Sequence, residues 1–299
     1  MKKLPLVFSG CLLGLAGAGN LVLDTLPVLS HLLSLTGLIL WLFFLLLHLF
    51  NWKETKQELT KPPLLSGMAT FPMAGMILST YVFRVFPHLP LVAQGLWWCS
   101  FLLDLALIAG FTIKFACPGK RVNATPSWTV LYVGIAVAAL TYPLVAIIEI
   151  AYATLSFGFL LTFYLYPLIY SDLKKNPLPL ALLGQEGIYC APFSLLLASL
   201  VRVGGASLPT WVLIFMLLAS QSFFFFVLTR LPNILKQGFQ PAFSALTFPT
   251  IITATSLKMA QGILKLPFLD YLVLAETVIC LIILLFVLGA YLIWLRKKV

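Results

Sequence analysis

Charged side chains are scarce in this chain of 299 residues. Asp, Glu, Lys and Arg make up 9% of the residues, whereas 61% are hydrophobic, and soluble domains carry roughly a quarter charged residues. The mean hydropathy is accordingly high, at +1.05. This shortage of charge excludes a soluble globular domain and predicts an integral membrane protein.

Cysteine and histidine are also sparse and scattered. The chain has five cysteines without a CxxC pair, and its three histidines do not cluster: Cys11, Cys99, Cys117, Cys190, Cys280, His31, His48 and His88. These residues form neither a disulfide framework nor a metal-binding pattern. HExxH, GxSxG and P-loop motifs are missing as well. We therefore expect no enzyme, no metal site and no cofactor.

Long apolar runs separated by charges or prolines fill the sequence. Because a helix needs about 20 apolar residues to cross the hydrocarbon core, the runs predict ten spans in a single transmembrane domain, 1–299, with Pro143 as the least certain boundary. The predicted spans are 5–23, 28–50, 66–86, 90–114, 127–145, 147–170, 180–201, 208–229, 240–263 and 268–295. An all-α membrane fold follows, with no room for a soluble domain.

The net charge of +10 reflects membrane topology. Fifteen basic residues lie on one side of the ten-span arrangement: Lys2, Lys3, Lys53, Lys56, Lys61, Lys114, Lys120, Arg121, Lys174, Lys175, Arg230, Lys236, Arg296, Lys297 and Lys298. The other four are Arg84, Arg202, Lys258 and Lys265. By the positive-inside rule both termini are cytoplasmic, in a cell inner (plasma) membrane. The charge therefore does not indicate a nucleic-acid partner.

The stretch from Phe243 to Lys258 concentrates polar groups on one stripe of an apolar helix. Ser244, Phe248, Thr255 and Lys258 recur at helical spacing along it. Pro249 removes a backbone hydrogen bond and predicts a kink beside Phe248. At membrane depth the freed carbonyl needs a partner from neighbouring helices, side chains or water. A lined cavity is therefore expected here.

Three spans repeat the same proline pattern. Phe71-Pro72, Ala191-Pro192 and Phe248-Pro249 each lie a few residues inside a span, with 120 residues between the first two prolines and 57 between the last two. Steps of about 60 residues lead back to Cys11 and forward to Tyr132, neither of which is proline. Such a period indicates repeated supersecondary units. We expect five related helical hairpins with pore kinks at Pro72, Pro192 and Pro249.

Five like hairpins in a row run the same way across the membrane and close naturally into a ring. The odd-numbered spans, which carry the prolines, glycines and hydroxyls, would face inward. The even-numbered spans are apolar on all sides, as in 38–49, and would face lipid. The expected fold is a pseudo-fivefold arrangement of hairpins around a central pore.

Three motifs in the odd-numbered spans resemble those of a known family. Phe71-Pro72-Met73, Ala124-Thr125-Pro126-Ser127-Trp128 and Ala245-Leu246-Thr247-Phe248-Pro249 are similar to motifs of the tellurite-resistance and C4-dicarboxylate transporter family. That family includes TehA-like bacterial anion channels, fungal malate transporters and slow-type anion channels of plant guard cells. The resemblance implies five inner helices around a pore in each protomer of a homotrimer. The chain departs from the family pattern at Cys11 and Tyr132, where the family often has proline.

The resemblance also implies that Phe248 occupies the position of the pore-occluding phenylalanine. A ring in a narrow pore blocks ions by steric occlusion and by excluding water. The alternative is ordinary packing, since aromatic residues on apolar helices mostly pack. Phe71 is the parallel residue in the third span and a candidate second gate, with the same alternative.

Charged residues in the inner spans have two interpretations each. Lys258 either attracts anions to the outer part of the pore or extends to the membrane interface, and Arg84 and Arg202 share these alternatives. Glu186 either takes part in proton coupling or pairs with a nearby cation. Asp104, Glu149 and Glu276 lie on even-numbered spans, where packing, trimer contacts or interfacial solvation are expected.

Hydroxyl groups are candidate pore-lining donors. Partial replacement of an anion's hydration shell would suit weak binding and passage, and the candidates are Ser9, Thr70, Thr247, Thr250 and Thr255. Each has the alternative of bonding to a carbonyl of its own helix.

An anion channel or transporter is the expected function, with chloride, nitrate, dicarboxylates or oxyanions as small-anion substrates. The rival within transport is a proton-coupled carrier of malate-like dicarboxylates, or a tellurite-resistance carrier, and it requires a titrating group such as Glu186. A receptor finds no support, because the chain contains no sensor or signalling domain.

Overall fold

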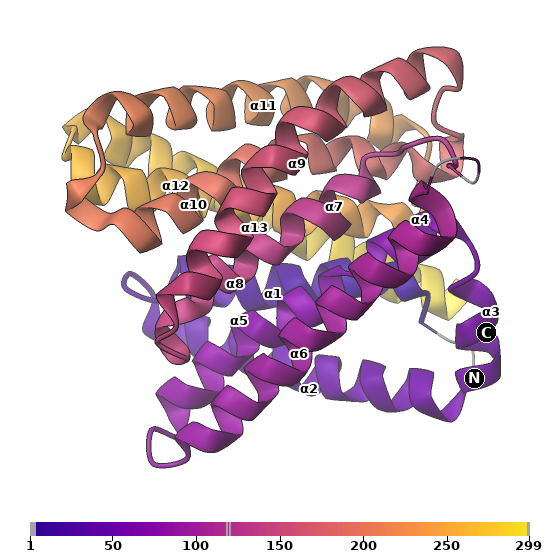
Figure 1. The fold of residues 1–299 in the computed structure, drawn as a ribbon, viewed down its shortest axis with the longest axis horizontal. Helices are drawn as coiled ribbons and strands as arrows, with labels where there is room; N and C mark the ends of the chain where they lie inside the picture. The colour runs from indigo at the N-terminus through magenta and orange to yellow at the C-terminus, as the bar shows by residue number, and fades with distance from the viewer. Residues whose placement is uncertain (1–3, 118, 120, 298–299) are drawn as a thin grey trace.

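The computed structural model describes residues 4–117, 119 and 121–297. Across these ranges the chain is helical and has no β-strand (Figure 1). Eight helices have the length and apolar composition needed to cross a membrane. The all-α membrane fold expected from composition is therefore present. Lys2, Lys3, Lys120 and Lys298, which entered the predicted topology, lie outside the described residues.

Five long helices form the outside of the structure. Only 28 to 39% of each apolar window is buried inside the protein, so most of their surface is left for lipid. They are α2 (Pro27–Phe50), α6 (Pro90–Phe111), α9 (Ile148–Lys175), α11 (Thr210–Lys236) and α13 (Pro267–Lys297).

The inner helices are shorter and more buried. Three of the eight candidate spans belong to this group, and 67 to 72% of their apolar windows is buried. The inner helices are α1 (Ser9–Leu21), α5 (Thr70–Val85), α7 (Ser127–Val133) with α8 (Val137–Thr141), α10 (Ala191–Gly204) and α12 (Thr247–Leu264).

The first and ninth predicted spans, 5–23 and 240–263, are not among the eight candidates. Leu6–Leu21 is a shorter apolar helix, and α12 carries threonine, serine and lysine that lower its hydropathy. Both are nevertheless largely buried, because neighbouring helices shield their small and hydroxyl-bearing residues. Ten crossings therefore remain the prediction from sequence.

The inner helices contact one another in a closed ring. Contacts run from α1 to α5, from α5 to α8, from α8 to α10, from α10 to α12 and from α12 back to α1. Figure 1 shows these segments between the long outer helices. The ring joins segments that lie far apart in the sequence, so it depends on the alternation of inner and outer helices.

Most of the inner helices follow another short helical segment. The 3-10 segments η1 (Leu6–Phe8), η5 (Leu180–Cys190) and η7 (Pro241–Leu246) precede α1, α10 and α12, and the short helix α4 (Pro62–Gly67) precedes α5. The prolines at 72, 192 and 249 lie in the first turn of α5, α10 and α12. A proline there costs no helical hydrogen bond. They therefore begin α-helices, which differs from the predicted kink within a continuous helix.

The third inner helix breaks without a proline. Two residues after Tyr132, the 3-10 segment η3 (Gly134–Ala136) separates α7 from α8. A Cβ atom on Gly134 would lie 2.6 Å from the sulfur of Met73. Glycine therefore allows α5 to approach the chain at this break. The next boundary follows at Pro143, where the 3-10 segment η4 (Tyr142–Leu144) and the positive φ of 56° at Ala146 precede α9.

Hydrogen bonds between neighbouring inner helices follow the 60-residue step. Ser9 and Thr70 share a 2.6 Å bond and are 61 residues apart, and Ser194 bonds to Thr253, 59 residues away, at 2.9 Å. Thr247 joins the two ends of the ring by donating to the Gly10 carbonyl at 2.9 Å. The repeated units therefore pack side by side at matching levels.

The first and last helices meet at the same end of the structure. The rings of Phe8 and Tyr291 lie 5.0 Å apart in an edge-to-face arrangement, and Tyr291 donates a hydrogen bond to the Pro241 carbonyl. In Figure 1 the outer helices α2, α6, α9, α11 and α13 end on the right. The inner helices begin at this end.

Candidate functional site

A cavity of about 60 Å³ lies where the five inner helices begin. Every inner segment contributes to its wall, with Gly10, Thr70, Val130, Ala191 and Phe248 as one residue from each. These five follow one another at steps of 60, 60, 61 and 57 residues. The cavity wall therefore has the same period as the sequence and lies at the centre of the ring.

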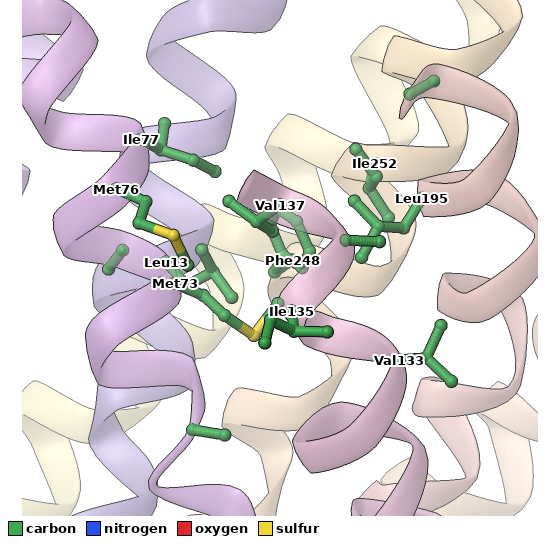
Figure 2. Packing of buried hydrophobic residues seen from close by; sticks show 14 of the residues in the cluster. Leu13, Met73, Met76, Ile77, Val133, Ile135, Val137, Leu195, Phe248 and Ile252 are labelled. Atoms are coloured by element: carbon green, nitrogen blue, oxygen red, sulfur yellow. The ribbon is translucent and has the colours of Figure 1, made fainter. Parts of the chain in front are cut away.

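Phe248 lines this cavity. It is 4% exposed, and Figure 2 shows its ring among apolar side chains from several inner helices, including Met73, Ile135 and Val137. A Cβ atom on Gly17 would lie 3.2 Å from the ring of Phe248, so α1 packs directly against it. Phe248 therefore lies in an apolar layer that borders the cavity.

Further apolar residues thicken this layer. Leu13, Met76, Ile77, Leu195 and Ile252 are buried around the same region (Figure 2). Protein interiors of this kind are packed at crystal-like density. A hydrated ion crosses such a layer only if side chains move.

The wall of the cavity is apolar with a few hydrogen-bonding groups. Thr70, Ser127 and Gln185 contribute polar atoms, and none of the wall residues in the described part of the chain is charged. Ser127 accepts a hydrogen bond from Ser66 at 2.7 Å. Gln185 is buried and its Oε1 atom has no partner among the described residues. The wall therefore offers neutral dipoles and no fixed ion partner.

The starts of the inner helices add a favourable field for anions. Thr70, Ser127, Ala191 and Pro249 line the cavity and lie in the first turns of α5, α7, α10 and α12. Helix N-termini carry partial positive charge, although here the N–H groups of Phe71 and Trp128 already bond to the preceding carbonyls of Met68 and Thr125. Because several such ends converge on one cavity, a negative charge there is stabilised without a charged side chain.

Most of the predicted hydroxyl donors point elsewhere. Thr70 lines the cavity, whereas Ser9, Thr247, Thr250 and Thr255 are outside its wall. These four hydroxyls bond to backbone carbonyls of their own segments at 2.7 to 3.0 Å. Thr247 also bonds to the neighbouring α1. These four side chains therefore follow the alternative, in which the hydroxyl bonds to a carbonyl of its own helical segment.

Phe71 packs away from the cavity. Its ring stacks on Trp41 of α2 with centroids 4.6 Å apart and an interplanar angle of 4°, and its carbonyl accepts a 3.0 Å hydrogen bond from Trp41 Nε1. Phe71 and Pro72 are both absent from the cavity wall. The position of Phe71 therefore does not support a second gate. It fits the alternative of ordinary packing.

Glu186 is paired and does not line the cavity. Arg230 of α11 donates from Nε to Oε2 and from Nη2 to Oε1, both at 3.0 Å. Such a two-pronged arrangement is the strongest geometry for an arginine and a carboxylate. Glu186 therefore fits the alternative of pairing with a nearby cation. The adjacent residue Gln185 lines the cavity instead.

Lys258 lies at the opposite end of α12 from the cavity. Its ammonium group donates to the Leu21 carbonyl at 2.9 Å and pairs with Asp24 at 3.0 Å. It therefore joins α12 to the end of α1. Arg84 makes a different kind of contact: its guanidinium carbon lies 5.6 Å from the centroid of the Tyr81 ring.

The described residues contain no group of three or more His, Cys, Asp and Glu side chains able to hold a metal ion. The five cysteines are free, and Cys11, Cys190 and Cys280 are buried.

Sequence reasoning missed Gln185, Ser127 and Gly10 as cavity residues. Gln185 directly precedes Glu186, the predicted candidate in that segment, and Ser127 follows Pro126 in the second of the three family-like motifs. The 60-residue step applied to Phe248 leads through Ala191, Val130 and Thr70 to Gly10 and would have found that residue, but it does not reach Gln185 or Ser127.

Comparison with known proteins bears on this ring and its cavity. Among the curated proteins, no match to the chain was found. Residues 3–292 match the family described as voltage-dependent anion channel, SLAC1. The match covers nearly the whole chain and agrees with the family suggested by the proline motifs, whose members are membrane channels and transporters of anions. The chain therefore belongs to the SLAC1 family of voltage-dependent anion channels.

Proposed function

We propose that this chain passes small anions through the centre of the inner ring and that Phe248 occludes the pathway. The observation that carries the proposal is the cavity whose wall all five inner segments share and to which Phe248 contributes. Family membership supports anion transport in general. The role of Phe248 as the gate and the identity of the ion go beyond family membership and belong to the proposal.

The chemistry of the wall favours passage over tight capture. Helix N-termini attract a negative charge, while an uncharged wall holds it weakly, as rapid conduction requires. Gln185 and Ser127 supply neutral donors that replace part of the hydration shell. Chloride, nitrate, malate-like dicarboxylates and oxyanions such as tellurite are the candidate ions.

Substitution of the gate tests the proposal directly. Phe248→Ala removes the ring from the apolar layer, and we expect a larger anion current than that of the wild type in planar bilayers. Chloride, nitrate, malate and tellurite would be compared in the same series. An unchanged current at normal expression would refute the gate.

Phe71→Ala is the matched control for this experiment. It removes an equally buried ring from the second position of another inner helix, α5, but one that stacks on Trp41 of α2. We expect no increase in current from Phe71→Ala. An increase equal to that of Phe248→Ala would mean that loosened packing, not gate removal, opens the pathway.

A proton-coupled carrier is the alternative within transport. It would require a titrating group at the ion pathway, yet Glu186 is held by Arg230 outside the cavity wall. We therefore expect currents that do not depend on a pH gradient. Uptake of malate or tellurite driven by such a gradient would favour the carrier.

The proposed setting is a cell inner (plasma) membrane, with the cavity end and both termini in the cytoplasm and three chains per assembly. The basic side chains at the ends of α9, α11 and α13 support this orientation. The trimer follows the family resemblance. Its test is the mass of the purified complex with detergent and lipid subtracted.

A further inference from the structure

A second and larger cavity lies on the outside of the ring. It is a groove of about 370 Å³ between α6 and α9, with α7 as its floor, and Figure 1 shows α7 between these two outer helices. The volume falls within the range of small-molecule sites. The groove is separate from the central cavity, because its wall shares no residue with that cavity's wall.

The long wall of the groove is hydrocarbon. Phe157, Leu161, Leu165 and Leu168 of α9 lie at i, i+4, i+8 and i+11 on one helical face. They extend over about 16 Å at 1.5 Å per residue. Ile108 of α6 faces them from the other side. The wall has the length and character needed to hold a segment of an acyl chain.

The polar groups inside the groove satisfy one another. The Thr112 hydroxyl donates to the Ile108 carbonyl at 2.7 Å, so the Tyr132 hydroxyl donates to Thr112 Oγ1, also at 2.7 Å. Thr112 opens η2 (Thr112–Ala116), a π-helical turn that continues α6. Such turns widen an α-helix and are frequent at functional sites. The groove interior therefore offers no free charge to a polar ligand.

A positive rim surrounds the end of the groove near the membrane surface. Arg121 lines this end and bonds to Asp172 at 2.7 and 3.3 Å. A guanidinium has five N–H donors, so three remain for a ligand. Lys114 and Lys175 are exposed nearby, on η2 and at the end of α9. Arg121 is paired with the Asp172 carboxylate, while Lys114 and Lys175 add two exposed positive charges to this region.

We propose that this groove binds one anionic membrane phospholipid, with an acyl chain along α9 and its phosphate at Arg121. The apolar wall and the basic rim match the two parts of such a lipid. A second copy of this chain fits less well, because a copy with the same orientation brings the same basic residues to the same depth. The lipid would pack behind α7, whose opposite face lines the central cavity.

Native mass spectrometry of the purified full-length protein tests the site. The probe is phosphatidylglycerol added to delipidated protein, with phosphatidylcholine as the uncharged comparison. We expect one phosphatidylglycerol per chain to survive activation, and phosphatidylcholine to dissociate. Leu161→Trp fills the groove and should abolish retention, whereas Leu160→Trp, on the adjacent residue that is 70% exposed, should leave it unchanged.

Arg121→Gln tests the headgroup contact. Loss of a charge-assisted hydrogen bond should weaken phosphatidylglycerol retention roughly tenfold and remove the preference over phosphatidylcholine. Equal retention of both lipids by the wild type would overturn the proposal, as would full retention by Leu161→Trp. Failure of the intact assembly to retain either lipid would also overturn it and would indicate that another copy covers the groove.

Discussion

Glu186 and Arg230 face each other at the end of the structure where the inner helices begin. Their side chains differ in exposure, at 14% for Glu186 and 42% for Arg230. An unpaired carboxylate in the more buried position loses hydration that nothing replaces, whereas an arginine left alone still reaches solvent. The two partners therefore contribute unequally to the same ion pair.

This asymmetry predicts unequal effects of neutral substitutions. Arg230→Gln should destabilise the protein by about 1–3 kcal/mol, because it leaves Glu186 without its donors, and Glu186→Gln by about 1 kcal/mol or less. Thermal unfolding of the purified variants in detergent measures both. Equal losses, or a larger loss from Glu186→Gln, would contradict this account of the pair.

At the scale of the helix, the position of proline within each inner helix determines its structural effect. Pro192 is in the first turn of α10 and follows the long 3-10 segment η5. Proline in a first turn is compatible with the helix, whereas an interior proline removes a hydrogen bond and clashes with the preceding turn. Position within the helix, and not the presence of proline, therefore decides its effect.

A pair of substitutions in α10 tests this dependence on position. Pro192→Ala should change stability by less than about 1 kcal/mol. Ala198→Pro, in the buried middle of the same helix, should cost about 3 kcal/mol or more. The yield of monodisperse protein and its thermal midpoint are the measurements. A severe defect in Pro192→Ala would mean that this proline shapes the ring in a way its position does not indicate.

The same scale explains what the sequence predicts and what it leaves open. Proline and charge punctuation predicts the hairpins, and the 60-residue step predicts the ring. The face that each inner helix turns to the centre is harder to predict, because these helices are buried on nearly all sides and no exposed stripe marks their orientation. Phe71 illustrates the error: the cavity pairs Phe248 with Thr70, one residue earlier, and one residue rotates a side chain by about 100°.

Changes of helix type add to this difficulty. Gln185 lies in η5, which turns by three residues, so a periodicity of 3.6 extended back from α10 misplaces it. The hydroxyls of Thr250 and Thr255 fit an α-helical stripe, yet they bond to carbonyls of their own helix. Hydroxyl spacing alone does not distinguish a pore lining from such internal bonding.

For the whole molecule, the distribution of charge relative to the ring predicts orientation. The outer helices end in basic residues at the same end at which the inner helices start. This end therefore combines the central cavity, the positive helix termini and the basic surface. In the proposed orientation, anions in the cytoplasm would meet the central cavity before the apolar layer around Phe248.

Cysteine labelling in a cysteine-free background checks this orientation. Ser207→Cys lies between α10 and α11 and Thr60→Cys between α3 (Trp52–Glu58) and α4, and both positions are exposed. A membrane-impermeant maleimide should label residue 207 in intact cells and residue 60 only after permeabilisation. The reverse pattern would invert the proposed topology.

The ring closes through bonds that span most of the chain. Thr247 reaches Gly10 and Lys258 reaches Leu21, each across 237 residues. During synthesis, α1 therefore enters the membrane long before its partner α12 exists, while every other neighbouring inner pair is joined by a much shorter stretch of chain that includes one outer helix. Contacts of such long range form late. We infer that the contact between α1 and α12 is the last part of the ring to assemble. A chain that ends before α12 would leave the α12-facing side of α1 without its partner.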